Sequence, residues 1–214
     1  MYTPKKDVAN WYNEIVAKAG LIDNYDISGC YIIRPDAYEI WENVVSYLDP
    51  KLKQLGLRNC YFPMFVTEES MQLEKDHLDD FKPELAYIDV RHGEKDGNEK
   101  NIAIRPTSES IMYPTFKKWL NSYRDLPIKI NQYCSVVRWE TKACWPFLRT
   151  REFLWHEGHT AHQTKDEALV HNQDILDLYI DIFENQMAIP IVPGVKSVAE
   201  TFAGNLITLL KWDF

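Results

Sequence analysis

The sequence predicts an α+β fold, in which an antiparallel sheet is flanked by helices. Segments of helical period alternate with short, β-rich segments along the 214 residues. The clearest β signal is a pair of alternating segments, 136–140 and 151–159, with mostly polar or turn-forming residues between them. Strands joined in this way run antiparallel. A connecting loop longer than the usual length of about two to five residues is typical of a substrate-binding loop.

The composition indicates a packed, acidic, globular chain. Hydrophobic residues make up 45% of the sequence and aromatic residues 13%, which is enough for a sizeable core. The net charge of −8 argues against a general nucleic-acid-binding surface, although a local basic patch can still receive RNA. No run of residues approaches membrane-spanning length, and the first residues do not form the apolar core of a signal peptide. We therefore expect a cytoplasmic protein that does not contact membranes.

The cysteines and histidines do not predict a metal site. The four cysteines are scattered and form no Cys-x-x-Cys pair, so the sequence indicates reduced thiols rather than a zinc knuckle or a disulfide framework. His156, His159 and His162 surround Glu157, but their spacing does not fit His-Glu-x-x-His, and Gly158 weakens a helix there. On a strand, His156 and His159 point to opposite faces. We predict that no metal is bound by these side chains.

The first half of the chain is predicted to contain two amphipathic helices. Thr3-Pro4 is typical of a helix cap and first turn, and the apolar stripe that follows ends at Gly20. A longer stripe runs over 37–55 and ends at Gly56, and Pro50 inside it is expected to kink or split the helix. The other elements predicted here are strands within 26–35 and over 59–66, a helix over 68–81, and strands over 85–90 and 102–104 around an exposed loop.

The second half is predicted to contain two further helices around the hairpin. The segment 105–110 leads into a helix over 109–121, and Thr107 or Ser108 is expected to cap it. That reading explains the two hydroxyls but not the carboxylate of Glu109 beside them. The remaining elements are a strand over 126–133, which leads into the hairpin, and a long helix over 165–188 capped by Thr164.

The hairpin resembles motif 2 of the class II aminoacyl-tRNA synthetases. Its pattern is Arg-x-Glu at Arg138 and Glu140, a loop, and then Arg-x-x-x-Phe at Arg149 and Phe153. The sequences of segments 136–140 and 146–155 are similar to those of prolyl-tRNA synthetases of the eukaryotic and archaeal type. The long helix, glycine, strand and proline of 37–63 resemble motif 1, which implies a homodimer because motif 1 builds the family's dimer interface. The segment 105–110 resembles the family's Thr-x-Glu loop, which receives the substrate's amino group.

The resemblance implies a proline–tRNA ligase, which activates L-proline with ATP to prolyl-adenylate and transfers it to tRNA(Pro). Arg138 is the implied catalytic residue, because one guanidinium can grip both the substrate carboxylate and the α-phosphate. The nucleotide phosphates imply Mg²⁺. The residues implied for proline are Thr107, Glu109, Arg138, Trp155, Glu157, His159 and Phe202. Those implied for ATP are Arg138, Glu140, Arg149, Thr150, Phe153, Phe81 and Glu84.

Plainer interpretations of these residues remain open. Arg138 can form a salt bridge with a neighbouring glutamate, and Phe81 can be a core aromatic. At the level of the whole protein, one alternative is a non-catalytic, truncated paralogue that binds partners or small ligands. Another is a seryl or threonyl enzyme of the same subgroup. Segment 105–109, Trp155 and His159 speak against the latter.

The family pattern covers residues 1–204 as a partial class II catalytic core, and it lacks motif 3 and an anticodon-binding domain. The tail 205–214 departs from the pattern. One possible codon set for this tail, shifted by two bases, reads Phe-Asn-Asn-Thr-Ile-Glu-Met-Gly-Phe, which is much closer to the family. We therefore expect a frameshift near codon 205 in the gene or its translation. Genomic and transcript sequence across that codon tests this, and the idea fails if no alternative frame restores the pattern.

Overall fold

The protein is built around a three-stranded sheet in the order β3-β7-β8. The computed structural model describes residues 7–75, 85–89, 101–140, 142–195 and 209–210. In the central sheet, β7 (Ile128–Val137) and β8 (Glu152–Ala161) pair antiparallel along their whole length. β3 (Arg58–Asn59) joins β7 in parallel. The predicted α+β architecture, with antiparallel sheets and helices around them, is confirmed.

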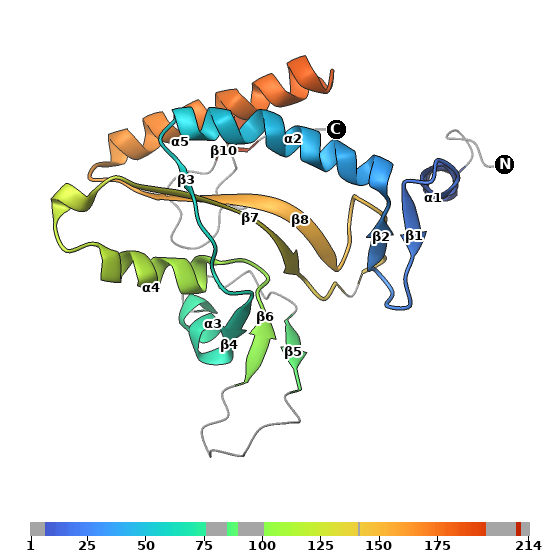
Figure 1. Ribbon diagram of the computed structural model, residues 1–214, viewed down its shortest axis with the longest axis horizontal. Coiled ribbons are helices and arrows are strands. Elements are labelled where there is room, and N and C mark those ends of the chain that lie inside the picture. Colours follow the sequence, from blue (N-terminus) through green and yellow to red (C-terminus); the bar gives the residue numbers. More distant parts are fainter. Residues whose placement is uncertain (1–6, 76–84, 90–100, 141, 196–208, 211–214) are drawn as a thin grey trace.

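Helices cover the two faces of this sheet (Figure 1). α2 (Pro35–Gln54) and α5 (Lys165–Asp181) lie on one face, and α4 (Glu109–Trp119) lies on the other. The first layer is held together by a buried apolar cluster, and the second by another cluster that joins α4 to β7. The members of the first cluster are Leu48, Leu52, Leu57, Leu178 and Ile182; those of the second are Phe62, Met112, Phe116 and Ile130.

Smaller elements surround the central sheet. A second antiparallel sheet, in the order β4-β6-β5, consists of β4 (Phe65–Thr67), β6 (Ile102–Ile104) and β5 (Ala86–Ile88). The others are α1 (Val8–Lys18), the hairpin of β1 (Ile22–Asn24) and β2 (Tyr31–Ile33), α3 (Glu68–Lys75), a 3-10 turn (Tyr123–Asp125), a π turn (Ile182–Gln186), and the pair of β9 (Gly194–Val195) and β10 (Leu209–Leu210).

The two N-terminal helices begin and continue differently from the prediction. α1 begins at Val8, with Asp7 as its N-cap accepting from the Asn10 amide, whereas Thr3-Pro4 lies outside the described residues. α2 runs through Pro50 without the expected split. The proline lies within one turn of the helix end, and the buried Leu48 and Leu52 anchor the helix on both sides of it. Both helices end as expected, since Gly20 and Gly56 follow them with positive φ angles of 68° and 87°.

The predicted single strand over 59–66 is two strands in two different sheets. β3 ends at Asn59 and β4 begins at Phe65, with Pro63 between them. Pro63 has no N–H to donate, and the neighbouring backbone is hydrogen-bonded by side chains instead. The Phe62 amide donates to the Gln132 side chain at 2.5 Å, and the Phe62 carbonyl accepts from Arg105 at 2.6 Å. The segment therefore crosses from one sheet to the other.

The strands of the predicted hairpin are placed differently along the chain. The segment predicted as a separate strand over 126–133 is continuous with the first hairpin strand, and together they form β7. β7 ends at Val137, so Arg138 and Glu140 lie in the loop rather than on the strand as predicted. The predicted helix over 165–188 is α5 followed by the π turn, and Thr164 caps it as expected by accepting from the Glu167 amide.

Parts of other predicted elements fall outside the described residues. These are the end of the helix predicted over 68–81, the loop 91–100 and most of the tail 205–214. Within the described part of the chain, no helix is long and apolar enough to cross a membrane.

Candidate active site

The register of β7 and β8 gathers one set of side chains on the face toward α4. Gln132 lies opposite Glu157, Cys134 opposite Trp155, and Ile130 opposite His159. Because side chains alternate along a strand, Phe153, Trp155, Glu157 and His159 share this face. The indole N–H of Trp155 points across the pair to Cys134 Sγ at 3.3 Å, and the Phe153 and Trp155 rings meet edge to face at 5.9 Å.

Arg138 reaches this face from the residue that follows the end of β7. Its backbone N–H donates to the Arg151 carbonyl at 2.8 Å, and its Nε donates to the Pro106 carbonyl at 3.1 Å. The guanidinium carbon lies 5.5 Å from the centre of the Phe153 ring and 5.4 Å from that of Trp155. These contacts hold the cation over two aromatic rings at the open end of the strand pair.

The charges of three carboxylates act on Arg138. Burial lowers the pKa of Arg138, and the charges of Glu109, Glu140 and Glu157 act against that shift. Guanidinium groups remain protonated in proteins, so Arg138 is a fixed cation among anions. This arrangement suits a ligand that brings both a negative and a positive group to the site.

Glu157 is a buried carboxylate with a partner on each oxygen. Its Oε1 accepts from Ser108 Oγ at 2.5 Å and from Gln132 Nε2 at 2.9 Å, while Oε2 lies 3.0 Å from His159 Nε2. Burial alone would raise the pKa of Glu157, but hydrogen bonds from His159, Ser108 and Gln132 bring it below its usual value. Glu157 is therefore ionised at neutral pH.

The first residue of α4, Glu109, supplies a second carboxylate. The Thr107 hydroxyl donates to the Glu109 carboxylate. Ser108 occupies the N-cap position of α4, but its side chain makes no capping hydrogen bond, so the predicted capping role is wrong. Its hydroxyl instead donates to Glu157. Because Glu157 lies far away in the sequence, local sequence patterns could not predict this hydrogen bond. The segment that resembles a Thr-x-Glu loop thus contacts β8 directly.

The residues predicted to bind the nucleotide phosphates lie in the loop between β7 and β8. Arg149 Nη1 is 3.9 Å from Glu140 Oε2, and both side chains are partly exposed. Thr150 Oγ1 donates to the Glu152 carbonyl at 2.7 Å. Glu140 is thus paired with Arg149, and the alternative of a salt bridge between Arg138 and a glutamate stays open. Phe81, Glu84 and Phe202 lie outside the described residues.

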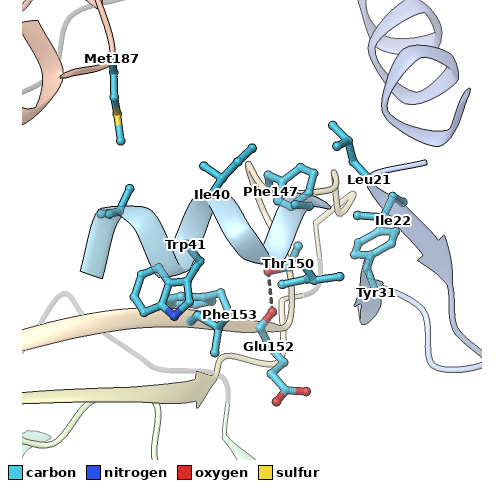
Figure 2. Close-up of a pocket in the computed structure, with 14 residues that line it drawn as sticks. Leu21, Ile22, Tyr31, Ile40, Trp41, Phe147, Thr150, Glu152, Phe153 and Met187 are labelled. Carbon is cyan, nitrogen blue, oxygen red and sulfur yellow. Dashed lines mark hydrogen bonds between the residues drawn. The ribbon is translucent and has the colours of Figure 1, made fainter. Parts of the chain in front are cut away.

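A cavity of about 570 Å³ adjoins the site (Figure 2). It lies between α2, the β1–β2 hairpin, the β7–β8 loop and the start of β8, and its walls are largely apolar. Trp41 of α2 and Phe147 of the loop line it, as do Thr150 and Phe153. Arg138, Glu109, Glu157 and His159 are not among its lining residues, so the charged cluster and this cavity are neighbouring but separate features.

The other face of β8 carries a histidine in a different setting. His156 Nε2 lies 2.6 Å from the Tyr179 hydroxyl of α5, and Nδ1 lies 2.9 Å from Asn131 Oδ1. Burial lowers the pKa of His156 to about 4. His159 contacts Tyr113 of α4 instead, so the two histidines do point to opposite faces. Within the described residues, no group of three or more His, Cys, Asp or Glu side chains gathers to hold a metal ion.

Sequence reasoning missed two members of the charged cluster. Gln132 is fully buried opposite Glu157, and Tyr113 lies 3.4 Å from His159 Nδ1. A glutamine among the otherwise apolar residues on one face of the strand was a usable signal for the first, because a buried amide needs polar partners. No local signal marks Tyr113, which reaches the site only because α4 packs below β7.

Comparison with known proteins identifies the family. The model of the tRNA synthetase class II core domain (G, H, P, S and T) matches residues 89–208. The chain belongs to this family. The class II core it carries is 52% identical over 202 residues to a putative proline–tRNA ligase of Schizosaccharomyces pombe, covering 94% of the chain and 28% of the relative. It is 50% identical over 206 residues to the cytoplasmic proline–tRNA ligase of Arabidopsis thaliana, covering 95% and 38%.

A solved structure shares the fold of this class II core. The crystal structure of prolyl-tRNA synthetase from Cryptosporidium parvum, complexed with L-proline and AMP, matches with a TM-score of 0.88 and 46% identity. The match covers 99% of this chain and 42% of that one. The chain therefore spans less than half the length of each of these relatives.

Proposed function

We propose that this chain forms part of the catalytic domain of a proline–tRNA ligase. Its reaction is the ATP-dependent activation of L-proline to prolyl-adenylate, followed by transfer of proline to tRNA(Pro). The observation that carries the proposal is the position of Arg138, whose guanidinium lies over the Phe153 and Trp155 rings on the face that also carries Glu157. The crystal structure bound to L-proline and AMP, which shares this fold, supports the same assignment.

In the activation step, the proline carboxylate attacks the α-phosphorus of ATP. A carboxyl–phosphorus bond forms, the bond between the α- and β-phosphates breaks, and pyrophosphate leaves. Negative charge grows on the α-phosphate oxygens during this exchange. Arg138 can grip the carboxylate and the α-phosphate together, which aligns the two reactants and stabilises that charge. In the second step a tRNA hydroxyl attacks the carbonyl carbon, and AMP leaves.

The carboxylates of Glu109 and Glu157 give the site its affinity for the ammonium group of an amino acid. Proline carries a secondary ammonium with two N–H donors, which a carboxylate and a hydroxyl can satisfy. Glu109 and Thr107 are already in contact and supply both groups. Trp155 supplies an apolar wall, and Glu157 with His159 supplies a fixed polar one. The resemblance alone adds Phe202 to this pocket.

The nucleotide is assigned to the open end of the strand pair. We assign stacking on the adenine ring to Phe153, contact with its amino group to Glu140, and the phosphates to Arg149 and Thr150. The contact between Arg149 and Glu140 has to open for both to reach ATP; because the two atoms are 3.9 Å apart and both side chains are partly exposed, opening it costs little free energy. The resemblance alone adds Phe81 and Glu84.

Further ligands and partners follow from the same proposal. Mg²⁺ enters with the triphosphate, whose oxygens suit a hard cation. Among the described residues, no group of three or more His, Cys, Asp or Glu side chains could hold the ion without the nucleotide. We also propose a homodimer through the region of α2, β3 and β4, and a cytoplasmic location like that named for the Arabidopsis relative.

Binding measurements on the 214-residue chain test the proposal. Saturation-transfer NMR with L-proline, L-serine and L-threonine, each with and without AMP, should detect proline binding in preference to the other two. Preferential binding of serine or threonine would point to another enzyme of the subgroup. Absence of any amino-acid binding would favour a non-catalytic paralogue.

The chain itself should show little proline-dependent ATP–pyrophosphate exchange. Within the described residues β8 is the outermost strand of its sheet, and the cations that we assign to the phosphates lie in the β7–β8 loop. Catalysis needs both reactants held within a fraction of an ångström, so a partial site is worth little. Robust exchange by a monodisperse preparation would contradict this expectation.

A further inference from the structure

Gln132 stands at the centre of the charged cluster although no motif includes it. Its side chain is fully buried on β7, directly opposite Glu157 of β8. A buried amide that is fully hydrogen-bonded contributes specificity, because each bond lost leaves an unsatisfied polar group behind. Where its hydrogen bonds go therefore shows what it holds in place.

The Gln132 amide connects three separate segments. Its Oε1 accepts from the backbone N–H of Phe62, in the crossing between the two sheets, at 2.5 Å. Its Nε2 lies 3.2 Å from Ser108 Oγ, before α4, and 2.9 Å from Glu157 Oε1 on β8. The backbone donor at Oε1 fixes the orientation of the amide, since a flip would place two donors face to face.

Ser108 closes the connection between the two carboxylates of the site. It receives from Gln132 and donates to the same Glu157 oxygen at 2.5 Å. One residue away, Thr107 donates to Glu109. Gln132 thus fixes the Glu157 carboxylate directly and fixes the Thr107–Glu109 segment through Ser108.

We propose that Gln132 is a positioning residue for the amino-acid site: its amide sets the place of the Glu157 carboxylate relative to Glu109 and Arg138. This inference rests on the proposed function and deepens it. Gln132 does not touch the reacting atoms. It acts by presenting a preorganised pair of anions to the substrate ammonium, so that the site does not have to rearrange on binding.

A substitution of Gln132 whose effect is reversed by protonation can distinguish a positioning role of this residue from a general structural role. Gln132→Glu retains the shape and the acceptor for the Phe62 amide but puts a second carboxylate against Glu157. The other titratable groups that interact with Glu157 are His159 on β8, Cys134 on β7 and Cys60 after β3, and the Arg138 charge also acts on it. Two carboxylates at hydrogen-bond distance hold one shared proton at low pH, and that proton restores the lost N–H donor.

The experiment measures L-proline and AMP binding to the 214-residue chain at pH 8 and pH 6 by saturation-transfer NMR titration. For Gln132→Glu we expect the dissociation constant for proline to rise about tenfold or more relative to wild type at pH 8. At pH 6 the ratio should fall to about threefold or less. The dissociation constant for AMP should stay within about twofold at both pH values.

Two further variants complete the test. Gln132→Met has a similar shape but offers no group that a proton can convert into a donor, so its loss of proline affinity should be the same at both pH values. Asn131→Asp is the matched control. Asn131 is the neighbouring buried amide of β7, but it points to the opposite face, toward Asn59 and His156. It should leave both dissociation constants within about twofold.

The outcomes are distinct. Equal losses of proline and AMP affinity in Gln132→Glu, with no recovery at pH 6, would show a structural role and overturn the inference. Proline binding by Gln132→Glu equal to wild type would also overturn it, while leaving the proposed function intact. A wild-type chain that binds no proline would remove the proposed function and this inference together.

Discussion

Strand β8 places a histidine on each of its faces, and the two differ in what surrounds them. On one face His159 contacts an ionised carboxylate, Glu157, which is itself held from β7 and from the segment before α4. On the other face His156 contacts only neutral groups, Asn131 and Tyr179, and burial lowers its pKa to about 4. The charge of the partner, rather than the burial of the ring, distinguishes a candidate active-site histidine from a structural one.

The face of β8 that carries His156 also packs against a buried polar side chain without a hydrogen-bond partner among the described residues. His171 of α5 is 6% exposed, and neither of its ring nitrogens has a hydrogen-bond partner among the described residues. Burial, together with the charge of Lys129, lowers its pKa to about 4. Behind the strand, two buried histidines are kept neutral at neutral pH, whereas a cluster of charged side chains lies in front of it. This contrast predicts different responses to substitution.

The largest effect is expected for Arg138→Ala, which removes the cation at the end of the charged face. Binding of L-proline and of AMP should weaken together, each by roughly 100-fold, because one guanidinium serves both ligands. In any form of the protein that supports proline-dependent ATP–pyrophosphate exchange, the rate should fall by about 10²–10³. Arg124→Ala, at an exposed arginine over the Tyr123 ring, is the control. Near-normal binding by Arg138→Ala would exclude Arg138 from the mechanism.

Glu109→Gln should separate the two ligands. The substitution removes the charge facing the substrate ammonium, so proline binding should weaken roughly 10- to 100-fold while AMP binding changes little. Titrations of both ligands measure this split. Glu14→Gln, at a surface carboxylate paired with Lys18, serves as the control for a lost negative charge. Equal losses for both ligands would instead indicate that Glu109 only helps to form the start of α4.

His156 should make the stability of the folded protein sensitive to acid. The pKa of His156 is lowered from 6.5 to about 4, so between these values the unfolded chain binds more protons than the folded one. Stability therefore rises with pH in this range and is lost as the pH falls. At pH 5 the loss from His156 is about 2 kcal/mol relative to neutral pH. Urea unfolding at pH 7 and pH 5 measures it.

The comparison variant for acid sensitivity is His156→Gln. Glutamine can still bond to Asn131 and Tyr179 but does not titrate, so the variant should lose less stability than wild type between pH 7 and pH 5. Identical losses in the two proteins would show that His156 does not set the acid response.

The smallest effects distinguish the two hydroxyls that were expected to cap helices. Thr164 caps α5 through the Glu167 amide, so Thr164→Ala should cost about 1 kcal/mol of stability and leave proline binding unchanged. Ser108 donates to Glu157 and makes no cap bond, so Ser108→Ala should weaken proline binding several-fold. Thermal denaturation and proline titration of both variants measure the pair. If Ser108→Ala lowered the stability but left proline binding unchanged, the result would indicate that Ser108 acts only as a helix cap of α4.

Local patterns predicted most of the fold and the composition of the charged face. Alternation along 151–159 correctly placed Phe153, Trp155, Glu157 and His159 on one side of a strand. Helix stops at Gly20 and Gly56 were also predictable, because a residue with positive φ favours glycine. These features depend on local backbone geometry, that is, on the alternation of side chains along a strand and on the φ angles that each residue type favours.

Features that depend on distant partners were not predictable. The segment 59–66 divides between two sheets because Gln132 and Arg105 hydrogen-bond its backbone from elsewhere in the chain. The Ser108 hydroxyl could accept from a nearby backbone N–H of α4 or donate to the distant Glu157, and only the packing of α4 against β8 decides between these partners. β7 ends at Val137, although the Arg138 backbone N–H still donates to the Arg151 carbonyl, and β-propensity does not reveal where the strand ends.

The ten-residue register between β7 and β8 has a consequence for how this protein can vary. Insertions and deletions in the loop between the strands change its length without moving Gln132 away from Glu157. A single-residue insertion inside either strand would exchange the two faces and bring His156 to the position of the carboxylate. Natural length variation should therefore be confined to residues 138–151, and a designer can lengthen this loop to alter nucleotide contacts while the amino-acid site is left as it is.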